Sequence, residues 1–253
     1  MWIVEYRELI RILTISDLKV KYQGSALGFA WSLLNPLLMM LVLYAVFSNV
    51  FRFEQENFAL YLLIGIVSWR FLQIGTTTAM TAIAGKPSLV TKVCIPRQVL
   101  VLSSVLSGFI SSILEFSVLI PLLIFFGVKF SFSIAFFPLI HATYFLLVYG
   151  IGLILAALYV YYRDLNQIWD VLLQAGFFLS PVVYPISIVP EKYLGYYMLN
   201  PMTIIMEMYR ESLLYSKAPS GAEVALSLAA GFGLLLAGTF VFKRLERRFA
   251  EEI

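Results

Sequence analysis

Long apolar runs, separated by short charged segments, divide the chain. The first run, residues 22–51, contains no Lys, Arg, Asp or Glu. A helix of about 20 apolar residues already spans the hydrocarbon core of a bilayer, and further runs of sufficient length follow. The pattern predicts six transmembrane helices, at about residues 27–51, 58–83, 99–127, 134–162, 171–189 and 224–242.

The fifth run is the one in which prolines cluster. Pro181 and Pro185 lie inside it, and Pro190 follows directly. Proline removes a backbone donor, and a spanning helix tolerates it only where neighbouring groups bond the freed carbonyls. We therefore expect this helix to end or kink near Ser180-Pro181.

The composition fits a membrane protein and leaves little room for a second domain. Hydrophobic residues make up 61% of the 253 residues and charged residues 13%, against about 45–50% and 25% in an ordinary soluble domain. Six helices with a rise of about 1.5 Å per residue use most of this length. We expect an all-α integral membrane protein with a single transmembrane domain, residues 1–253, and no separate catalytic domain.

The distribution of Lys and Arg predicts the orientation, because positively charged loops remain in the cytoplasm. With six crossings the two termini share a side. That side carries Arg7, Arg11, Lys19, Lys21, Lys86, Lys92, Arg97, Arg163, Lys243, Arg244, Arg247 and Arg248. The other side carries Arg52, Lys129, Lys192, Arg210 and Lys217. Both termini are therefore expected in the cytoplasm.

The segment before the first run is amphipathic. Residues 2–18 place Ile3, Leu9, Ile10, Leu13 and Leu18 at helical spacing among charged side chains. Such a helix can anchor on the membrane surface. It can equally form a docking surface for a cytoplasmic subunit, and the pattern alone leaves both interpretations open.

The segment after the fifth run, residues 191–223, is too apolar for a solvated loop. It is rich in Tyr, Met and Ile and is interrupted by Asn200-Pro201. Two short helices that re-enter the outer half of the membrane would account for it. Non-helical backbone at that depth must be surrounded by protein or line a water-filled cavity, which argues for a pathway nearby.

Three ionisable residues, Arg70, Glu115 and His141, interrupt the apolar runs. Counted from the outer ends of their helices, all three lie about 17–18 Å deep at about 1.5 Å per residue. An ion pair between Arg70 and Glu115 would lower the cost of burying both charges. The pair can be structural or can line a pathway. His141 can instead sit among aromatic rings, since Phe136, Phe137 and Tyr144 are its neighbours.

Several kinds of chemistry lack the residues they need. The chain has one His and one Cys, Cys94, so a zinc site built on several of these ligands is excluded. No P-loop, nucleophile elbow or His-Glu-x-x-His motif occurs. The absence of an internal repeat favours a dimeric pathway over a self-sufficient secondary transporter. The 21 Phe and 15 Tyr suit an interfacial belt, or the stacking of sugar rings on aromatic faces.

A series of short motifs resembles one family over nearly the whole chain. They are Asp17-Leu-Lys-Val-Lys-Tyr, Leu27-Gly28, Trp31, Leu34-Asn35-Pro36-Leu37, Trp69-x-Phe71, Lys92-Val-Cys-Ile-Pro96-Arg97, Tyr162-Arg163-Asp164-Leu165, Ser180-Pro181-x-x-Tyr184-Pro185, and Leu199-Asn200-Pro201-Met202 with Arg210. In order and spacing they resemble the permease subunits of ABC exporters for lipid-linked polysaccharides, and the O-antigen exporters most. Arg70 departs from the pattern, since relatives commonly carry a small polar residue there.

The resemblance implies a homodimer in the bacterial inner membrane, bound to two copies of a separate ATPase subunit. That subunit would bind ATP and Mg²⁺, so no cofactor is expected in this chain and the chain itself is no enzyme. The cargo would be an undecaprenyl-pyrophosphate-linked glycan, and no nucleic acid is implied. Residues 1–21 resemble an interface helix, residues 84–98 a coupling loop, residues 163–167 a second cytoplasmic contact, and residues 188–217 paired gate helices. The resemblance thus favours the docking interpretation of the amino-terminal helix.

Three sets of candidate residues follow from the pattern and the resemblance together. The ATPase-coupling set is Arg7, Arg11, Lys86, Lys92, Arg97, Arg163 and Asp164. The substrate-path set is Trp31, Tyr44, Trp69, Arg70, Phe71, Glu115, Phe177, Phe178 and Tyr184. The gate set is Pro181, Pro185, Tyr193, Asn200, Pro201, Met202 and Arg210. The alternatives are an exporter of the same architecture for teichoic acid, capsule, lipid or drug, and a membrane-embedded enzyme acting on lipid-linked sugars.

Overall fold

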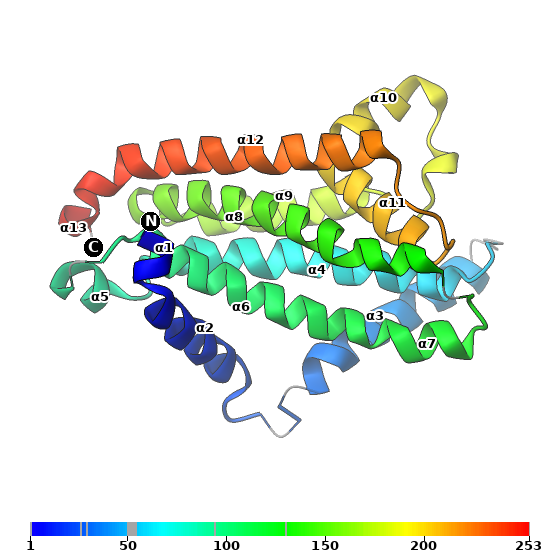
Figure 1. Ribbon diagram of the computed structural model, residues 1–253, viewed down its shortest axis with the longest axis horizontal. Helices are drawn as coiled ribbons and strands as arrows, with labels where there is room; N and C mark the ends of the chain where they lie inside the picture. Colours follow the sequence, from blue (N-terminus) through cyan, green and yellow to red (C-terminus); the bar gives the residue numbers. More distant parts are fainter. Residues whose placement is uncertain are drawn as a thin grey trace.

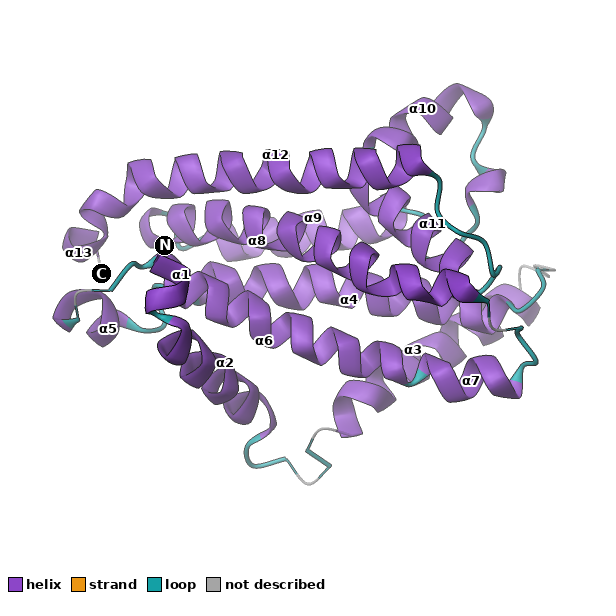
Figure 2. Cartoon of the chain, in the orientation of Figure 1, coloured by secondary structure: helices purple, strands orange, loops and turns teal. Residues whose placement is uncertain are grey.

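The computed structural model describes residues 2–25, 27–28, 30–49, 55–93, 95–129 and 131–252. Every regular element in these ranges is a helix, as Figure 2 shows. The expected all-α class is therefore confirmed. Cys94 lies outside the described residues.

The chain folds into an elongated bundle of antiparallel helices (Figure 1). In chain order the elements are α1 (Trp2–Glu5), α2 (Arg7–Tyr22), α3 (Ala30–Asn49), α4 (Phe58–Thr81), α5 (Pro87–Lys92), α6 (Gln98–Ser117), α7 (Leu119–Phe125), η1 (Phe132–Phe136), α8 (Phe137–Tyr161), α9 (Leu165–Leu179), η2 (Ile186–Ile188), α10 (Glu191–Leu199), α11 (Pro201–Leu213), α12 (Gly221–Leu245), η3 (Glu246–Arg248) and α13 (Phe249–Glu252). Helices α1, α5 and α13 gather at one end, which we call the terminal end. Helices α7, α10 and α11 lie at the opposite end, which we call the gate end.

Five helical segments in the described ranges are long and apolar enough to cross a membrane, where the sequence predicted six. They are Ala30–Asn49, Phe58–Thr81, Gln98–Phe125, Phe132–Tyr161 and Gly221–Arg248. The missing member corresponds to the predicted run 171–189. Its helix, α9, has 15 residues, about 22 Å at 1.5 Å per residue, short of the roughly 30 Å of hydrocarbon.

The end of α9 falls where the prolines predicted it. Ser180, the residue before Pro181, adopts an extended conformation with φ −106° and ψ 152°. The ring of a proline disfavours the α conformation in the preceding residue, so the helix stops at Leu179. The predicted break near Ser180-Pro181 is confirmed.

Helix α4 lies at the centre of the bundle. Its most apolar window is 83% buried, against 17% for α3 and 17% for α12. It packs against α6 and α8, and α12 crosses α8 on the outside. Gly238 allows that crossing, because a Cβ there would stand 2.3 Å from the carbonyl oxygen of Gly150. Small residues let spanning helices approach this closely.

The amino-terminal segment, predicted as a helix over residues 1–21, contains α1 and α2. Helix α2 descends away from the bundle in Figure 1 and is attached along α6. It buries Ile10 and Thr14 and leaves Ile12 and Val20 exposed. Among the described residues, part of its apolar surface therefore stays exposed.

The two short helices expected around Asn200-Pro201 are present as α10 and α11. The Asn200 side chain accepts a bond of 3.0 Å from the backbone N–H of Met202, and Pro201 occupies the first helical position. Both are favourable at the start of a helix. The chain therefore turns sharply between α10 and α11.

Candidate substrate groove, gate and partner-facing end

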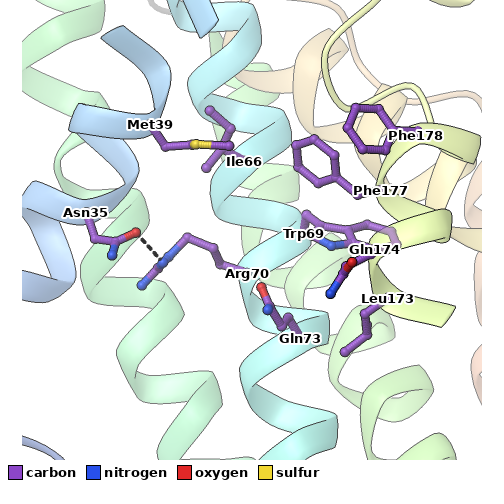
Figure 3. A pocket seen from close by; sticks show the side chains of 10 residues that line it. All are labelled: Asn35, Met39, Ile66, Trp69, Arg70, Gln73, Leu173, Gln174, Phe177 and Phe178. Atoms are coloured by element: carbon purple, nitrogen blue, oxygen red, sulfur yellow. Dashed lines mark hydrogen bonds between the residues drawn. The ribbon is translucent and has the colours of Figure 1, made fainter. Parts of the chain in front are cut away.

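A groove opens on the side of the bundle where α3, α4 and α9 meet (Figure 3). It encloses about 350 Å³ and is lined by Asn35, Met39, Ile66, Trp69, Arg70, Gln73, Leu173, Gln174, Phe177 and Phe178. Aromatic rings and amide or guanidinium groups thus line the same groove, with Arg70 and Asn35 on its α3 side and Trp69, Gln174 and Phe177 on its α9 side. Four members of the predicted substrate-path set meet here, namely Trp69, Arg70, Phe177 and Phe178.

Arg70 forms the polar centre of the groove. Its Nε and Nη2 donate to the two carboxylate oxygens of Glu115 at 3.1 and 3.4 Å, and its Nη1 donates to Oδ1 of Asn35 at 2.7 Å. The predicted ion pair between Arg70 and Glu115 is therefore present. The Arg70 side chain is 20% exposed and that of Glu115 is 2% exposed, so Glu115 lies behind the guanidinium and Arg70 faces the groove.

The aromatic part of the groove comes from α4 and α9. The rings of Trp69 and Phe177 meet edge to face with centroids 6.0 Å apart. Gly176 brings α9 close, because a Cβ there would stand 2.9 Å from the Trp69 ring. Phe178 is exposed beside them. An aromatic surface therefore faces the open side of α9.

Four members of the predicted path set lie away from this groove, namely Trp31, Tyr44, Phe71 and Tyr184, the last of which lines a separate hollow beside α10. Phe71 follows Trp69 by two residues, a rotation of about 200° on a helix. Its ring packs inside the bundle, 4.9 Å from Tyr144. Trp31 and Tyr44 are exposed on α3 but do not line the groove.

His141 belongs to a separate polar cluster inside the bundle. Its Nε2 is 2.9 Å from Oγ of Ser112, and its Nδ1 is 2.5 Å from the hydroxyl of Tyr209. Phe137 stacks on its ring with centroids 5.2 Å apart. The aromatic surroundings expected for His141 are present, and its hydrogen bonds join α6, α8 and α11.

Arg210 fastens the gate end. Its fully buried guanidinium lies 3.5 Å above the ring of Tyr61. Its Nη1 bonds to Glu207 at 2.8 Å, and its Nη2 donates to the carbonyl of Val182 at 3.0 Å. A buried charge is tolerated when it is paired and hydrogen-bonded. Arg210 therefore joins α11 to α4 and to the segment after α9, which contains Pro181 and Pro185.

A second set of bonds ties α10 to the same segment. Asn200 donates from Nδ2 to Oγ of Ser180 at 2.9 Å. The Tyr184 hydroxyl donates to the carbonyl of Phe178 at 2.7 Å and lies 2.9 Å from the hydroxyl of Tyr197. Of the other predicted gate residues, Tyr193 is exposed on α10 and Met202 is buried on α11.

The predicted ATPase-coupling residues gather at the terminal end but differ in exposure. Five of them are exposed, namely Arg7, Arg11, Lys92, Arg163 and Asp164. Lys86 instead bonds to both carboxylate oxygens of Asp17, at 2.8 and 3.0 Å. Arg97 is half-buried and donates to the backbone carbonyl of Glu246. Two of the cations thus serve contacts within the chain.

Sequence reasoning missed several polar partners. Asn35, Gln73 and Gln174 line the groove, and each interrupts an apolar helix. A polar residue inside a spanning segment is itself a functional indication, and that signal could have found them. In the described part of the chain, no group of three or more His, Cys, Asp or Glu side chains could hold a metal ion.

Comparison with known proteins identifies the family of this chain. Residues 8–214 match the ABC-2 type transporter family. The chain is 33% identical over 252 residues to the O-antigen export system permease protein RfbA of Myxococcus xanthus, covering 98% of this chain and 96% of that protein. It is 28% identical over 245 residues to the protein of the same name from Klebsiella pneumoniae, covering 96% and 94%.

A more distant relative is the polysialic acid transport protein KpsM of Escherichia coli. It is 22% identical over 232 residues, covering 89% of this chain and 88% of that protein. The family match and the identity to the first relative both extend over most of the chain. The chain therefore belongs to the ABC-2 type transporter family.

Proposed function

We propose that this chain is the membrane-spanning subunit of an ATP-driven exporter that moves undecaprenyl-pyrophosphate-linked O-antigen polysaccharide across the bacterial inner membrane. The observation that carries the proposal is the groove between α3, α4 and α9. It combines the rings of Trp69, Phe177 and Phe178 with the polar groups of Arg70 and Gln174. The permease names of the relatives with 28–33% identity support the cargo.

The groove chemistry suits a sugar ring. One face of a sugar presents C–H groups that stack on aromatic rings, and its edge presents hydroxyls. The amides of Asn35, Gln73 and Gln174 can both donate to and accept from hydroxyls. Contacts of this kind are individually weak and repeated, so a polymer can slide past them, as conduction through any pore requires.

A homodimer would close the groove. Arg70, Gln73 and Gln174 face an open side of the bundle, and lipid tails cannot hydrogen-bond such groups. Helix α9 buries a single side chain, Leu173, so most of its surface awaits a neighbour. In the proposed assembly a second copy covers α3 and α9, and the two grooves face one shared path.

The proposed topology has six crossings. Helix α8 ends near the terminal end and α10 begins at the gate end (Figure 1), so α9 and the segment up to Val189 connect the two ends. With α9 counted as the fifth of six crossings, both termini lie in the cytoplasm and α10 with α11 form the outer gate. The cation-rich terminal end then faces the cytoplasm, in agreement with the positive-inside rule.

The proposed drive comes from a separate ATPase dimer. Its closure would press on α5 and on α2, whose Asp17 is joined to Lys86 at the start of α5. The two permease copies would rock apart and release the gate bonds of Arg210 at the far end. Energy would thus enter at one end of the bundle and open the path at the other.

The aromatic wall gives the proposal its direct test. In cells lacking the native copy, Phe177→Leu/Phe178→Leu should abolish surface glycan, and Phe177→Tyr/Phe178→Tyr should retain it, because stacking needs the ring. Phe125→Leu is the matched control, since Phe125 is exposed on α7 outside the groove. Surface glycan is measured by immunoblot at matched protein level. Normal export by the Leu pair would refute the role of the groove.

A further inference from the structure

The inference concerns Arg97, the residue that directly precedes α6. Its Nη1 donates to the backbone carbonyl of Glu246, which lies 149 positions later in the chain. Its guanidinium also lies 5.9 Å from the centre of the Phe249 ring. Both partners belong to the bend where α12 continues through η3 into α13. Arg97 therefore directs its contacts inward, toward this bend.

Phe249 is the anchor of the bend. Its ring is fully buried and meets Phe242 of α12 edge to face with centroids 5.4 Å apart. It also meets Tyr161, at the end of α8, at 6.2 Å. The Tyr161 hydroxyl donates to the carbonyl of Leu245 at 2.9 Å. The bend is thus fixed to the ends of both α8 and α12.

Helix α5 itself is lightly attached. Val90 is the one buried side chain among its six residues, and a hollow of about 530 Å³ separates much of it from Glu246. Lys86 holds its beginning through Asp17. Arg97 lies a few residues after α5. As Lys86 joins the beginning of α5 to α2, Arg97 joins the segment after α5 to the bend that follows α12. Helix α5 also approaches α13 directly, but among the described residues the side-chain hydrogen bond that joins its segment to the bend comes from Arg97.

We propose that Arg97 is a positioning residue that clamps the α5 segment to the η3–α13 bend, so that α5, α8 and α12 move as one body. The inference rests on the proposed function, in which a partner ATPase presses on α5. It assigns different roles to Lys92 and Arg97. Lys92 is exposed at the end of α5 and is free to meet the partner, whereas Arg97 transmits the push inside the chain.

A distance measurement on the full chain in nanodiscs tests the clamp without the ATPase. Spin labels are placed at Thr91→Cys and Glu252→Cys, two exposed positions, in a Cys94→Ser background. The distance distribution should be narrow with Arg97, remain narrow in Arg97→Lys, and broaden in Arg97→Ala. Phe249→Leu keeps an apolar side chain but removes the ring, and should broaden it as well. An unchanged distribution in both Arg97→Ala and Phe249→Leu overturns the clamp.

Coupling is then measured with the partner ATPase present. Arg97→Ala should bind the partner with unchanged affinity but lose the stimulation of ATP hydrolysis by the glycan, and Arg97→Lys should restore it. Lys92→Ala, the matched control, should weaken partner binding and leave the distance narrow. Loss of partner affinity in Arg97→Ala with an unchanged distance overturns the proposal, because Arg97 would then be a partner contact. A native chain that binds no ATPase refutes the proposed function alone, since the distance measurement still decides the clamp.

Discussion

The ion pair between Arg70 and Glu115 allows a quantitative test of the groove. The Nε to Oε2 distance is 3.1 Å, which at an effective dielectric constant of about 20 corresponds to an attraction of about 5 kcal/mol. Desolvation of both ions offsets much of this energy. Removing one partner is more damaging than removing both, because it leaves an uncompensated buried charge at a cost of about 3–5 kcal/mol.

We therefore expect Glu115→Gln and Arg70→Met each to lower the free energy of unfolding by about 3–5 kcal/mol. The double variant should lose less than either single variant, because it leaves no unpaired charge, so the two losses should fall short of additivity by about 3 kcal/mol or more. Asn35→Ala should cost less than either, since it removes one hydrogen bond to the guanidinium. Unfolding is measured by steric trapping in bicelles. Losses that add to within about 0.5 kcal/mol would refute an interacting pair.

Two further predictions concern the ends of the bundle. Arg210→Gln removes the cation above Tyr61 and should lower the free energy of local opening at the gate end by about 2 kcal/mol. This is measured as faster hydrogen exchange in α11. Unchanged exchange would show that Arg210 does not stabilise this end. Asp17→Asn should release α2 from Lys86 and speed exchange in α2, whereas Glu8→Gln, on the exposed side of α2, should not. Equal exchange in the two α2 variants would contradict the attachment.

The end of α9 and the start of α11 could be predicted from the sequence because they depend on local chemistry. Pro181 imposes an extended conformation on Ser180, and Asn200-Pro201 starts a new helix whatever surrounds it. The start of α9 was less accessible. Asp170 resembles the end of an apolar run, yet it lies exposed within α9, so the helix begins several residues earlier than predicted.

The assignment of residues to faces was harder, because it depends on which helices become neighbours. Trp69 and Phe71 both looked like path residues, but opposite faces of α4 meet α9 and α8. The contacts of Arg97 also could not be predicted from its neighbours in the sequence. A cation in a short loop suggests a partner subunit, and nothing local to it indicates Glu246 and Phe249, about 150 residues away.

Reconstitution tests the central claim most directly. The chain and its partner ATPase are placed in proteoliposomes with undecaprenyl-pyrophosphate-linked O-antigen, and the glycan that reaches the opposite face is measured. The account predicts movement that requires ATP, the partner and the aromatic rings of Phe177 and Phe178. Glycan that crosses without ATP, or conversion of the lipid-linked sugar by the chain alone, would contradict it.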